Sequence, residues 1–289
     1  MSAVVFDSNP NVLGEGPLWH PLRQELFWFD ILGCTLNARR LDGERISWRF
    51  AEPVSAAGWV DETTLLIASS SGLFRFDLIS GHVSMVADFP LGPVATRSND
   101  GRADRQGGFW IGTMGLNAEA GAGAIYRYSG GELRRLHGDV TIPNAICFSP
   151  DGAAAFFTGT QKGIIWRQPL DLETGWPSGE PDVFIDLRGE EFSPDGAIID
   201  AAGDFWIAQW GAARVACYGA DGRLKRTLAV PASHASCPAF GGPDLSTLFV
   251  TTAREGLSEE ELAASPLAGQ TFMIEAGVKG LEEPRVVLG

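Results

Sequence analysis

Four side chains with oxygen donors recur at matching places along this sequence. Each lies 10 to 12 residues before a phenylalanine within an apolar run, and the four are Glu15, Asn99, Asn144 and Asp195. Where these places meet in space, the two carboxylates repel each other, and a shared divalent cation is the simplest way to stabilise them. Carboxylate and amide oxygens suit Ca²⁺, Mg²⁺ or Mn²⁺, or an adaptable Zn²⁺ or Fe²⁺. Spacing alone leaves a second interpretation open, in which the four residues are hydrogen-bonded caps of strands.

A repeat indicates which elements position these residues. Six apolar runs start 39 to 50 residues apart: LFWFDI at 26–31, LLIASS at 65–70, FWIGTM at 109–114, AFFTGT at 155–160, FWIAQW at 205–210 and LFVTTA at 248–253. Further β-like runs between them bring each unit to about four strands, the content of one propeller blade. We therefore expect an all-β fold, a six-bladed β-propeller with a central metal-binding channel, as a single domain over residues 1–289.

The alternative architecture is a pair of stacked β-sandwiches, but the repeat continues evenly across any boundary between them. In the propeller, the N-terminal stretch SAVVF is expected to close the ring beside the last blade. The stretch SEEELAAS at 258–265 predicts a helix, because a serine precedes an acidic first turn.

The tetrapeptide SPDG occurs at 149–152 and again at 193–196, and its residues favour a turn. Asp151 lies five residues before Phe156, where the other repeats have a hairpin turn. Asp195 lies ten residues before Phe205, where the innermost strand of a blade is expected to begin. The alignment therefore predicts a turn at Asp151 and a side chain at the channel mouth for Asp195. Trp210, just after a strand, is expected to rim the pocket.

The charge of the chain limits the classes of molecule that it is expected to bind. The net charge is −14 and the pI is about 4.7, so a nucleic acid or an anionic membrane would be repelled. No stretch is apolar enough for export or for membrane anchoring, and no apolar stripe indicates a particular oligomeric state. The four cysteines are scattered, as expected of buried free thiols in the cytoplasm: Cys34, Cys147, Cys217 and Cys237.

Five stretches closely resemble the senescence marker protein, gluconolactonase and luciferin-regenerating enzyme family: LGEGPLW, RSNDGRADRQGGFWIGTM, IPNAICFSPDG, SPDGAIIDAAGDFWIAQWG and FGGPDLSTLFVTTAR. The resemblance covers residues 12–275. It implies a six-bladed propeller that hydrolyses sugar lactones with one divalent cation in the channel. It further implies Glu15, Asn144 and Asp195 as metal ligands, Asp195 as the catalytic acid and base, and Arg97 and Asn99 as substrate-binding residues.

Two departures from the family pattern bear on the substrate. Ser98 stands where the family usually has proline, so the backbone before Asn99 is less constrained. Many members hold a sugar hydroxyl with a glutamate soon after the Gly-Thr-Met; here the segment GLNAEAGAG offers Asn117 or Glu119, and we expect Glu119 to bind substrate.

The resulting prediction is a carboxylic-ester hydrolase that opens an aldono-1,4- or 1,5-lactone to the aldonic acid. Asp195 would take a proton from water and return it to the leaving ring oxygen. No nucleophile elbow, zinc-protease motif or phosphate loop occurs, so no covalent intermediate is indicated. Two alternatives are a noncatalytic interaction propeller and a paraoxonase-like hydrolase of esters or phosphotriesters.

Overall fold

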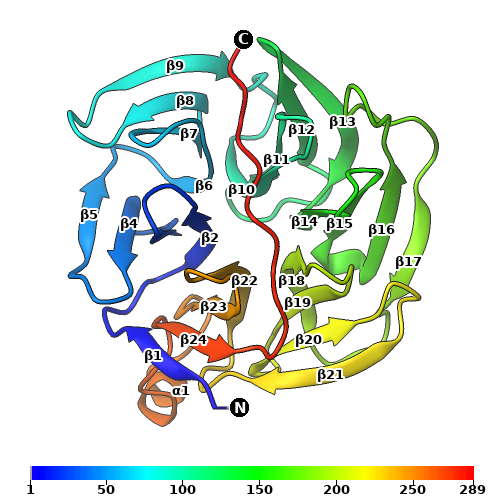
Figure 1. Ribbon diagram of the computed structural model, residues 1–289. Helices are drawn as coiled ribbons and strands as arrows, with labels where there is room; N and C mark the ends of the chain where they lie inside the picture. The colour runs from blue at the N-terminus through cyan, green and yellow to red at the C-terminus, as the bar shows by residue number, and fades with distance from the viewer. Residues whose placement is uncertain (1) are drawn as a thin grey trace.

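The computed structural model describes residues 2–289, which form six four-stranded antiparallel sheets. The sheets are arranged around a centre like the blades of a propeller, and Figure 1 shows the innermost strands β2, β6, β10, β14, β18 and β22 surrounding it. The predicted all-β, six-bladed propeller is confirmed. Among residues 2–289, no helix has the length and apolar character needed to cross a membrane.

The first three blades follow one another along the chain. Blade one contains β2 (Gly14–His20), β3 (Glu25–Asp30), β4 (Thr35–Arg40) and β5 (Ile46–Arg49). Blade two contains β6 (Val54–Trp59), β7 (Thr64–Ser69), β8 (Gly72–Asp77) and β9 (Val83–Asp88). Blade three contains β10 (Thr96–Ala103), β11 (Phe109–Gly115), β12 (Gly123–Ser129) and β13 (Glu132–Val140).

The last three blades complete the ring. Blade four contains β14 (Pro143–Phe148), β15 (Ala154–Gly159), β16 (Ile164–Pro169) and β17 (Asp182–Asp186), with a short 3-10 helix at Thr160–Lys162. Blade five contains β18 (Ser193–Ile199), β19 (Phe205–Trp210), β20 (Arg214–Tyr218) and β21 (Leu224–Ala229). Blade six contains β22 (Ala235–Gly241), β23 (Thr247–Thr252), β24 (Thr271–Glu275) and β1 (Val4–Asp7).

Each predicted apolar run forms the second strand of its blade, within one residue of the expected bounds. These strands do not alternate between apolar and polar residues, because both of their faces are covered by neighbouring blades. Phe109 and Phe205, for example, are completely buried. The hydrophobic core therefore lies between blades, and it holds the six innermost strands in fixed positions around the channel.

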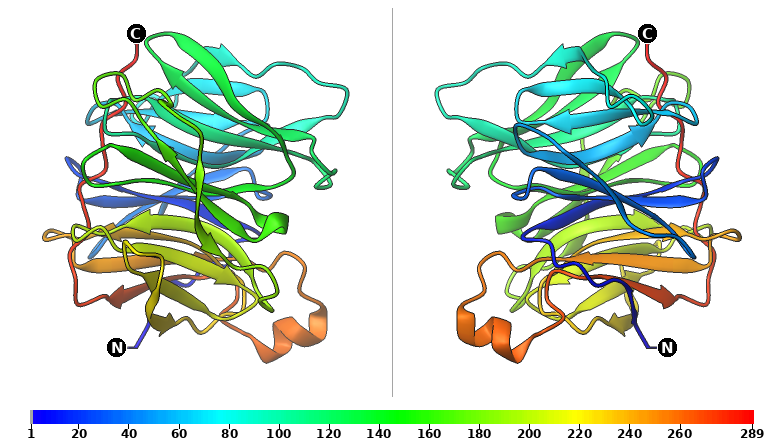
Figure 2. Two further views of the ribbon diagram at one scale, coloured as in Figure 1. Left: turned by 90° about the vertical axis from the view of Figure 1, so that its right-hand side faces the viewer. Right: turned by 90° about the vertical axis from the view of Figure 1, so that its left-hand side faces the viewer.

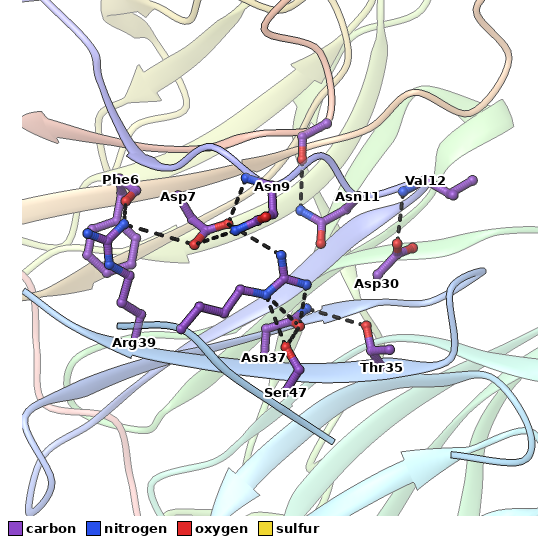
Figure 3. A network of polar contacts seen from close by, with 12 residues as sticks. Phe6, Asp7, Asn9, Asn11, Val12, Asp30, Thr35, Asn37, Arg39 and Ser47 are labelled. Atoms are coloured by element: carbon purple, nitrogen blue, oxygen red, sulfur yellow. Dashed lines mark hydrogen bonds and ion pairs between the residues drawn. The ribbon is translucent and has the colours of Figure 1, made fainter. Parts of the chain in front are cut away.

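Ring closure occurs as expected, since β1 pairs with β24 and so supplies the outer strand of blade six. A polar network ties this strand to blade one (Figure 3): the carboxylate of Asp7 faces the guanidinium groups of Arg39 and Arg45 at 3.9 and 3.5 Å. Arg45 also donates to the amide oxygen of Asn37. These contacts join blade six to blade one, next to the pairing of β1 with β24.

The C-terminal segment after β24 crosses one end of the channel, where Figure 1 draws it in red. Its backbone is held by blades two and three, because Val286 N donates to Trp59 O and Val287 N donates to Gly107 O, both at 2.8 Å. The buried carboxylate of Glu283 pairs with the buried guanidinium of Arg102 on β10. These contacts lie at the far end of the innermost strands from the predicted site.

The helix α1 (Glu259–Ala264) lies on the opposite side of the disc from this segment (Figure 2). It begins as predicted, with Ser258 as N-cap in a capping box with Glu261. Three of the four cysteines are buried free thiols, as expected, but Cys34 is only partly buried. The expectation was wrong for Cys34 because it lies in the turn between β3 and β4, at φ 53°, rather than in a strand.

Candidate active site

Every innermost strand carries a β-bulge near its beginning. In β18, Pro194 pairs with Gln209 and Ala197 pairs with Ile207, which leaves Asp195 and Gly196 opposite a single residue. The other five strands each contain one extra residue in the same way. A bulge interrupts the alternation of side chains and redirects one of them. This local irregularity lies at or next to the position of each predicted site residue at the channel mouth.

The bulges correct the alignment on which the site was predicted. Asn99 and Asp195 lie within their bulges, whereas Glu15 and Asn144 lie one position earlier and still pair with Phe29 and Thr158. The sequence alignment had placed all four at one position. The one-residue offset is tolerated because the bulged pair lets side chains on both sides of it face the same space.

One cavity of about 550 Å³ collects the predicted residues. Its lining includes five of them, which are Glu15, Arg97, Asn99, Asn144 and Asp195. These side chains come from blades one, three, four and five. The equivalent places in blades two and six hold Ser55 and Ser236, which bond to neighbouring blades and do not line the cavity. The innermost strands of four of the six blades therefore supply these five predicted residues.

Two predicted positions lie elsewhere. Glu119 does not line the cavity; its carboxylate turns back and accepts hydrogen bonds from the backbone and side chain of Asn117, both at 3.0 Å. Asn117 itself lines the cavity. Asp151 lies in the turn between β14 and β15, where its carboxylate accepts from Ser149 Oγ and Ala153 N. The prediction of a turn at Asp151 is confirmed.

A chain of hydrogen bonds fixes the amide groups of the site. Arg97 Nη1 donates to Asn99 Oδ1 at 2.9 Å, and Asn99 Nδ2 donates to Asn144 Oδ1 at 2.9 Å. Asn144 Nδ2 donates to Thr160 Oγ1 at 2.8 Å, and that hydroxyl donates to Pro194 O at 3.0 Å. The chain begins at a group that only donates and ends at one that only accepts, so both amides have a defined orientation. Asn144 Oδ1 keeps a free lone pair.

The two carboxylates are buried and lack cationic partners at contact distance. Glu15 and Asp195 are 7% and 6% exposed, and within residues 2–289 neither forms an ion pair. Burial, followed by the charge of Asp100, raises the pKa of Glu15 to about 8. Burial, followed by the charge of Glu15, raises the pKa of Asp195 well above its usual range. Both shifts thus have the same two causes, which are burial first and a neighbouring negative charge second, and the charge of Arg97 opposes the shift at Glu15 only in part.

This donor set fits a divalent metal ion. Two buried carboxylates and one oriented amide oxygen are hard ligands, and a cation between them would offset their desolvation and mutual repulsion. The described residues 2–289 contain no cluster of three or more His, Cys, Asp or Glu side chains with metal-binding geometry. A site built from these residues therefore depends on the amide of Asn144 as well as on the two acids.

Among the polar side chains of the cavity lining, the sequence did not single out Thr160 or Glu255, whereas it did single out the aromatic Trp210. Thr160 comes directly after β15, and Glu255 lies in the segment that follows β23, so both lie beyond the end of a second strand of a blade. That shared place was a usable signal, because loops after these strands open on the same side as the channel mouth. Trp210, which was expected just after a strand, is the last residue of β19 and does line the cavity.

Comparison with known proteins gives consistent results. A family model described as the SMP-30/Gluconolactonase/LRE-like region matches residues 13–254. A 6-deoxy-6-sulfogluconolactonase of Pseudomonas putida is 36% identical over 279 residues, which cover 95% of each chain. An L-arabinolactonase of Azospirillum brasilense is 34% identical, over 98% of this chain and 95% of that protein. The solved structure of a calcium-binding protein, regucalcin, from Agrobacterium tumefaciens superposes with a TM-score of 0.96 at 41% identity, over 98% of this chain and 97% of that one.

Proposed function

The chain belongs to the SMP-30/gluconolactonase/LRE-like family, and we propose that it is a carboxylic-ester hydrolase that opens the ring of a sugar lactone. The observation that carries this proposal is the single cavity in which two buried carboxylates, two oriented amides and one guanidinium meet. The lactonases named among its relatives support the reaction class. Their names specify different sugars, so the family alone does not select the substrate.

Glu15, Asn144 and Asp195 are the proposed ligands of one divalent cation. When bound, the cation supplies Lewis-acid polarisation of the ester carbonyl. Ca²⁺ is the first candidate, because the donors are hard oxygens and a related structure is named as a calcium-binding protein. Zn²⁺, Mg²⁺, Mn²⁺ and Fe²⁺ are the other candidates. The activity of the protein reloaded with each of these cations ranks them.

Asp195 is the proposed acid and base. Its carboxylate would accept a proton from the attacking water, whose oxygen forms the new bond to the carbonyl carbon. The bond between that carbon and the ring oxygen then breaks, and Asp195 returns the proton to the ring oxygen as it leaves. The product is the open-chain aldonic acid, and the reaction requires no covalent bond to the protein.

Arg97 and Asn99 are the proposed binding groups for the hydroxyl and ring oxygens of the substrate. Arg97 is positioned by its hydrogen bonds to Ser98 O and to Asn99 Oδ1. The proposed role of Glu119 in substrate binding is indirect. Its carboxylate accepts hydrogen bonds from Asn117, and Asn117 lines the cavity. An effect of Glu119 on substrate binding would therefore be transmitted by that neighbouring residue.

A pH-stat assay over aldono-1,4- and 1,5-lactones tests the proposal. The protein is stripped with chelator and then reloaded with each cation in turn, and acid release is compared with spontaneous hydrolysis. We expect metal-dependent opening of at least one lactone. Aryl esters and phosphotriesters form the comparison panel, because faster turnover of these would indicate a paraoxonase-like hydrolase. No turnover of any substrate by the loaded protein would instead favour a noncatalytic propeller.

A further inference from the structure

The cavity has an aromatic wall between blades five and six. Trp210 ends β19 and lines the cavity. Its ring stacks on that of His234, with centroids 4.1 Å apart and planes 18° from parallel. His234 in turn lies 3.0 Å from Glu255 O through Nδ1. His234 therefore covers one face of the indole, which also packs against the hydrophobic core cluster that includes Leu13 and Ala253, and the remaining surface of the indole lines the cavity.

A third carboxylate lies beside this wall. Glu255 is exposed and lines the same cavity. Its charge acts on the whole site: it raises the pKa of Glu15 and of Asp195, and among the charged groups it is the strongest influence favouring the charged form of Arg97. No ion pair within 4.0 Å joins Glu255 to a basic side chain in residues 2–289. Its carboxylate oxygens thus remain free to accept hydrogen bonds from a ligand.

Negatively charged side chains outnumber positively charged ones around the cavity. Three carboxylates face it, against one guanidinium, that of Arg97, which already donates to Ser98 O and Asn99 Oδ1. A divalent cation at the deep end would offset Glu15 and Asp195, but it would leave Glu255 at the rim unopposed. An anionic group placed there would meet a like charge.

We propose that Trp210 and Glu255 form the subsite for the part of the lactone that does not react, and that this subsite selects an uncharged polyhydroxyl arm. The proposal rests on the lactonase function proposed above and specifies its substrate class. The indole supplies a flat apolar surface for the C–H face of a sugar, and the carboxylate accepts from its hydroxyls. His234 is a positioning residue, since it contacts Trp210 and the backbone of Glu255 but does not itself line the cavity.

A matched pair of lactones tests the charge selection. D-Glucono-1,4-lactone carries a terminal CH₂OH group, and D-glucaro-1,4-lactone carries a carboxylate in its place. We expect wild-type protein to prefer the neutral lactone, and Glu255→Gln to reduce the ratio of the two kcat/KM values by about five- to tenfold. Glu173→Gln is the control, because it removes one exposed carboxylate that lies outside the cavity. An unchanged ratio in Glu255→Gln, or an equal change in Glu173→Gln, would overturn the selection.

Trp210 is tested by a readout that does not require turnover. Glucono-1,5-lactam, a neutral analogue that resists hydrolysis, is titrated calorimetrically into the metal-loaded protein. We expect Trp210→Leu to weaken its binding by about tenfold and Trp210→Phe to retain most of it. Equal binding by wild type and Trp210→Leu would overturn the subsite. If wild type opens no lactone, the proposed function fails, but the lactam titration still decides whether the wall binds a sugar ring.

Discussion

Asn99 Nδ2 donates to Asn144 Oδ1 at 2.9 Å, and this bond joins the innermost strands of blades three and four across the channel mouth. It ties the proposed substrate-binding amide to the proposed metal-binding amide. Arg97 donates to the oxygen of Asn99, and the nitrogen of Asn99 donates both to Asn144 Oδ1 and to Pro143 O, so the amide cannot turn over without losing three hydrogen bonds. Thr160 constrains Asn144 in a similar way, because its hydroxyl accepts a hydrogen bond from Asn144 Nδ2.

Thr160→Val should lower the affinity for the cation without altering any ligand. The hydroxyl holds Asn144 Nδ2 and bridges to Pro194 O, so its loss frees the amide to rotate. Removal of such an orienting group typically weakens metal binding by about ten- to a hundredfold. Competition with a fluorescent chelator measures this affinity. Thr160→Ser restores the hydroxyl and should restore binding; equal weakening in both variants would point to packing rather than to orientation.

Asp195→Asn should lower kcat by about a hundredfold or more. The substitution removes the proposed base and also the negative charge of one proposed metal ligand. Asp151→Asn is the matched control, since it makes the same change in an identical SPDG tetrapeptide that forms a turn. It should leave kcat close to wild type and cost a small amount of stability. Steady-state kinetics with each loaded protein decides the matter, and comparable losses of kcat would contradict the assignment of Asp195.

The six apolar runs could be predicted because each forms a strand that is buried on both faces, which produces an uninterrupted apolar sequence. Residues such as Glu15 and Asp195 stood out against that background. The bulges could not be predicted, since an extra unpaired residue depends on the partner strand and leaves no pattern of its own. Thr160 was missed for a related reason: its acceptor, Pro194 O, lies in the next blade, 34 residues away.

The affinity for the cation should rise with pH between about 6 and 8. Without the cation, the pKa of Glu15 is raised to about 8, so a proton occupies this carboxyl at pH 6 and must be displaced. One displaced proton increases the apparent affinity by up to about tenfold per pH unit below the pKa. Calorimetry at pH 6, 7 and 8 measures this dependence, and an affinity that falls as pH rises would contradict it.

The same shift has a consequence for the stability of the metal-free protein. Glu15 binds a proton more tightly when folded, at about 8, than at the ordinary value of 4.5, so its contribution to stability is fully present below pH 4.5. That contribution is lost as pH rises through 8. Urea denaturation with chelator present should therefore show that Glu15→Gln is less sensitive to pH than wild type between 6 and 8. Parallel pH profiles for the two proteins would exclude Glu15 as the group responsible.

Glu283→Gln should destabilise the protein far more than Glu282→Gln, although the two residues are adjacent. Glu283 is buried and pairs with the buried Arg102, whereas the side chain of Glu282 is exposed. Loss of one partner leaves the other charge uncompensated, which typically costs about 3 to 5 kcal/mol in the free energy of unfolding.

The C-terminal segment would then lose its main anchor across the channel end, although Val286 N and Val287 N would keep their backbone hydrogen bonds to Trp59 and Gly107. Urea denaturation of the two single variants measures the difference in the free energy of unfolding. The double variant Arg102→Met/Glu283→Leu removes both charges, so it should recover much of the loss, because the cost comes from the unpaired charge rather than from the missing bond. A double variant no more stable than Glu283→Gln would assign the loss to packing of the segment instead.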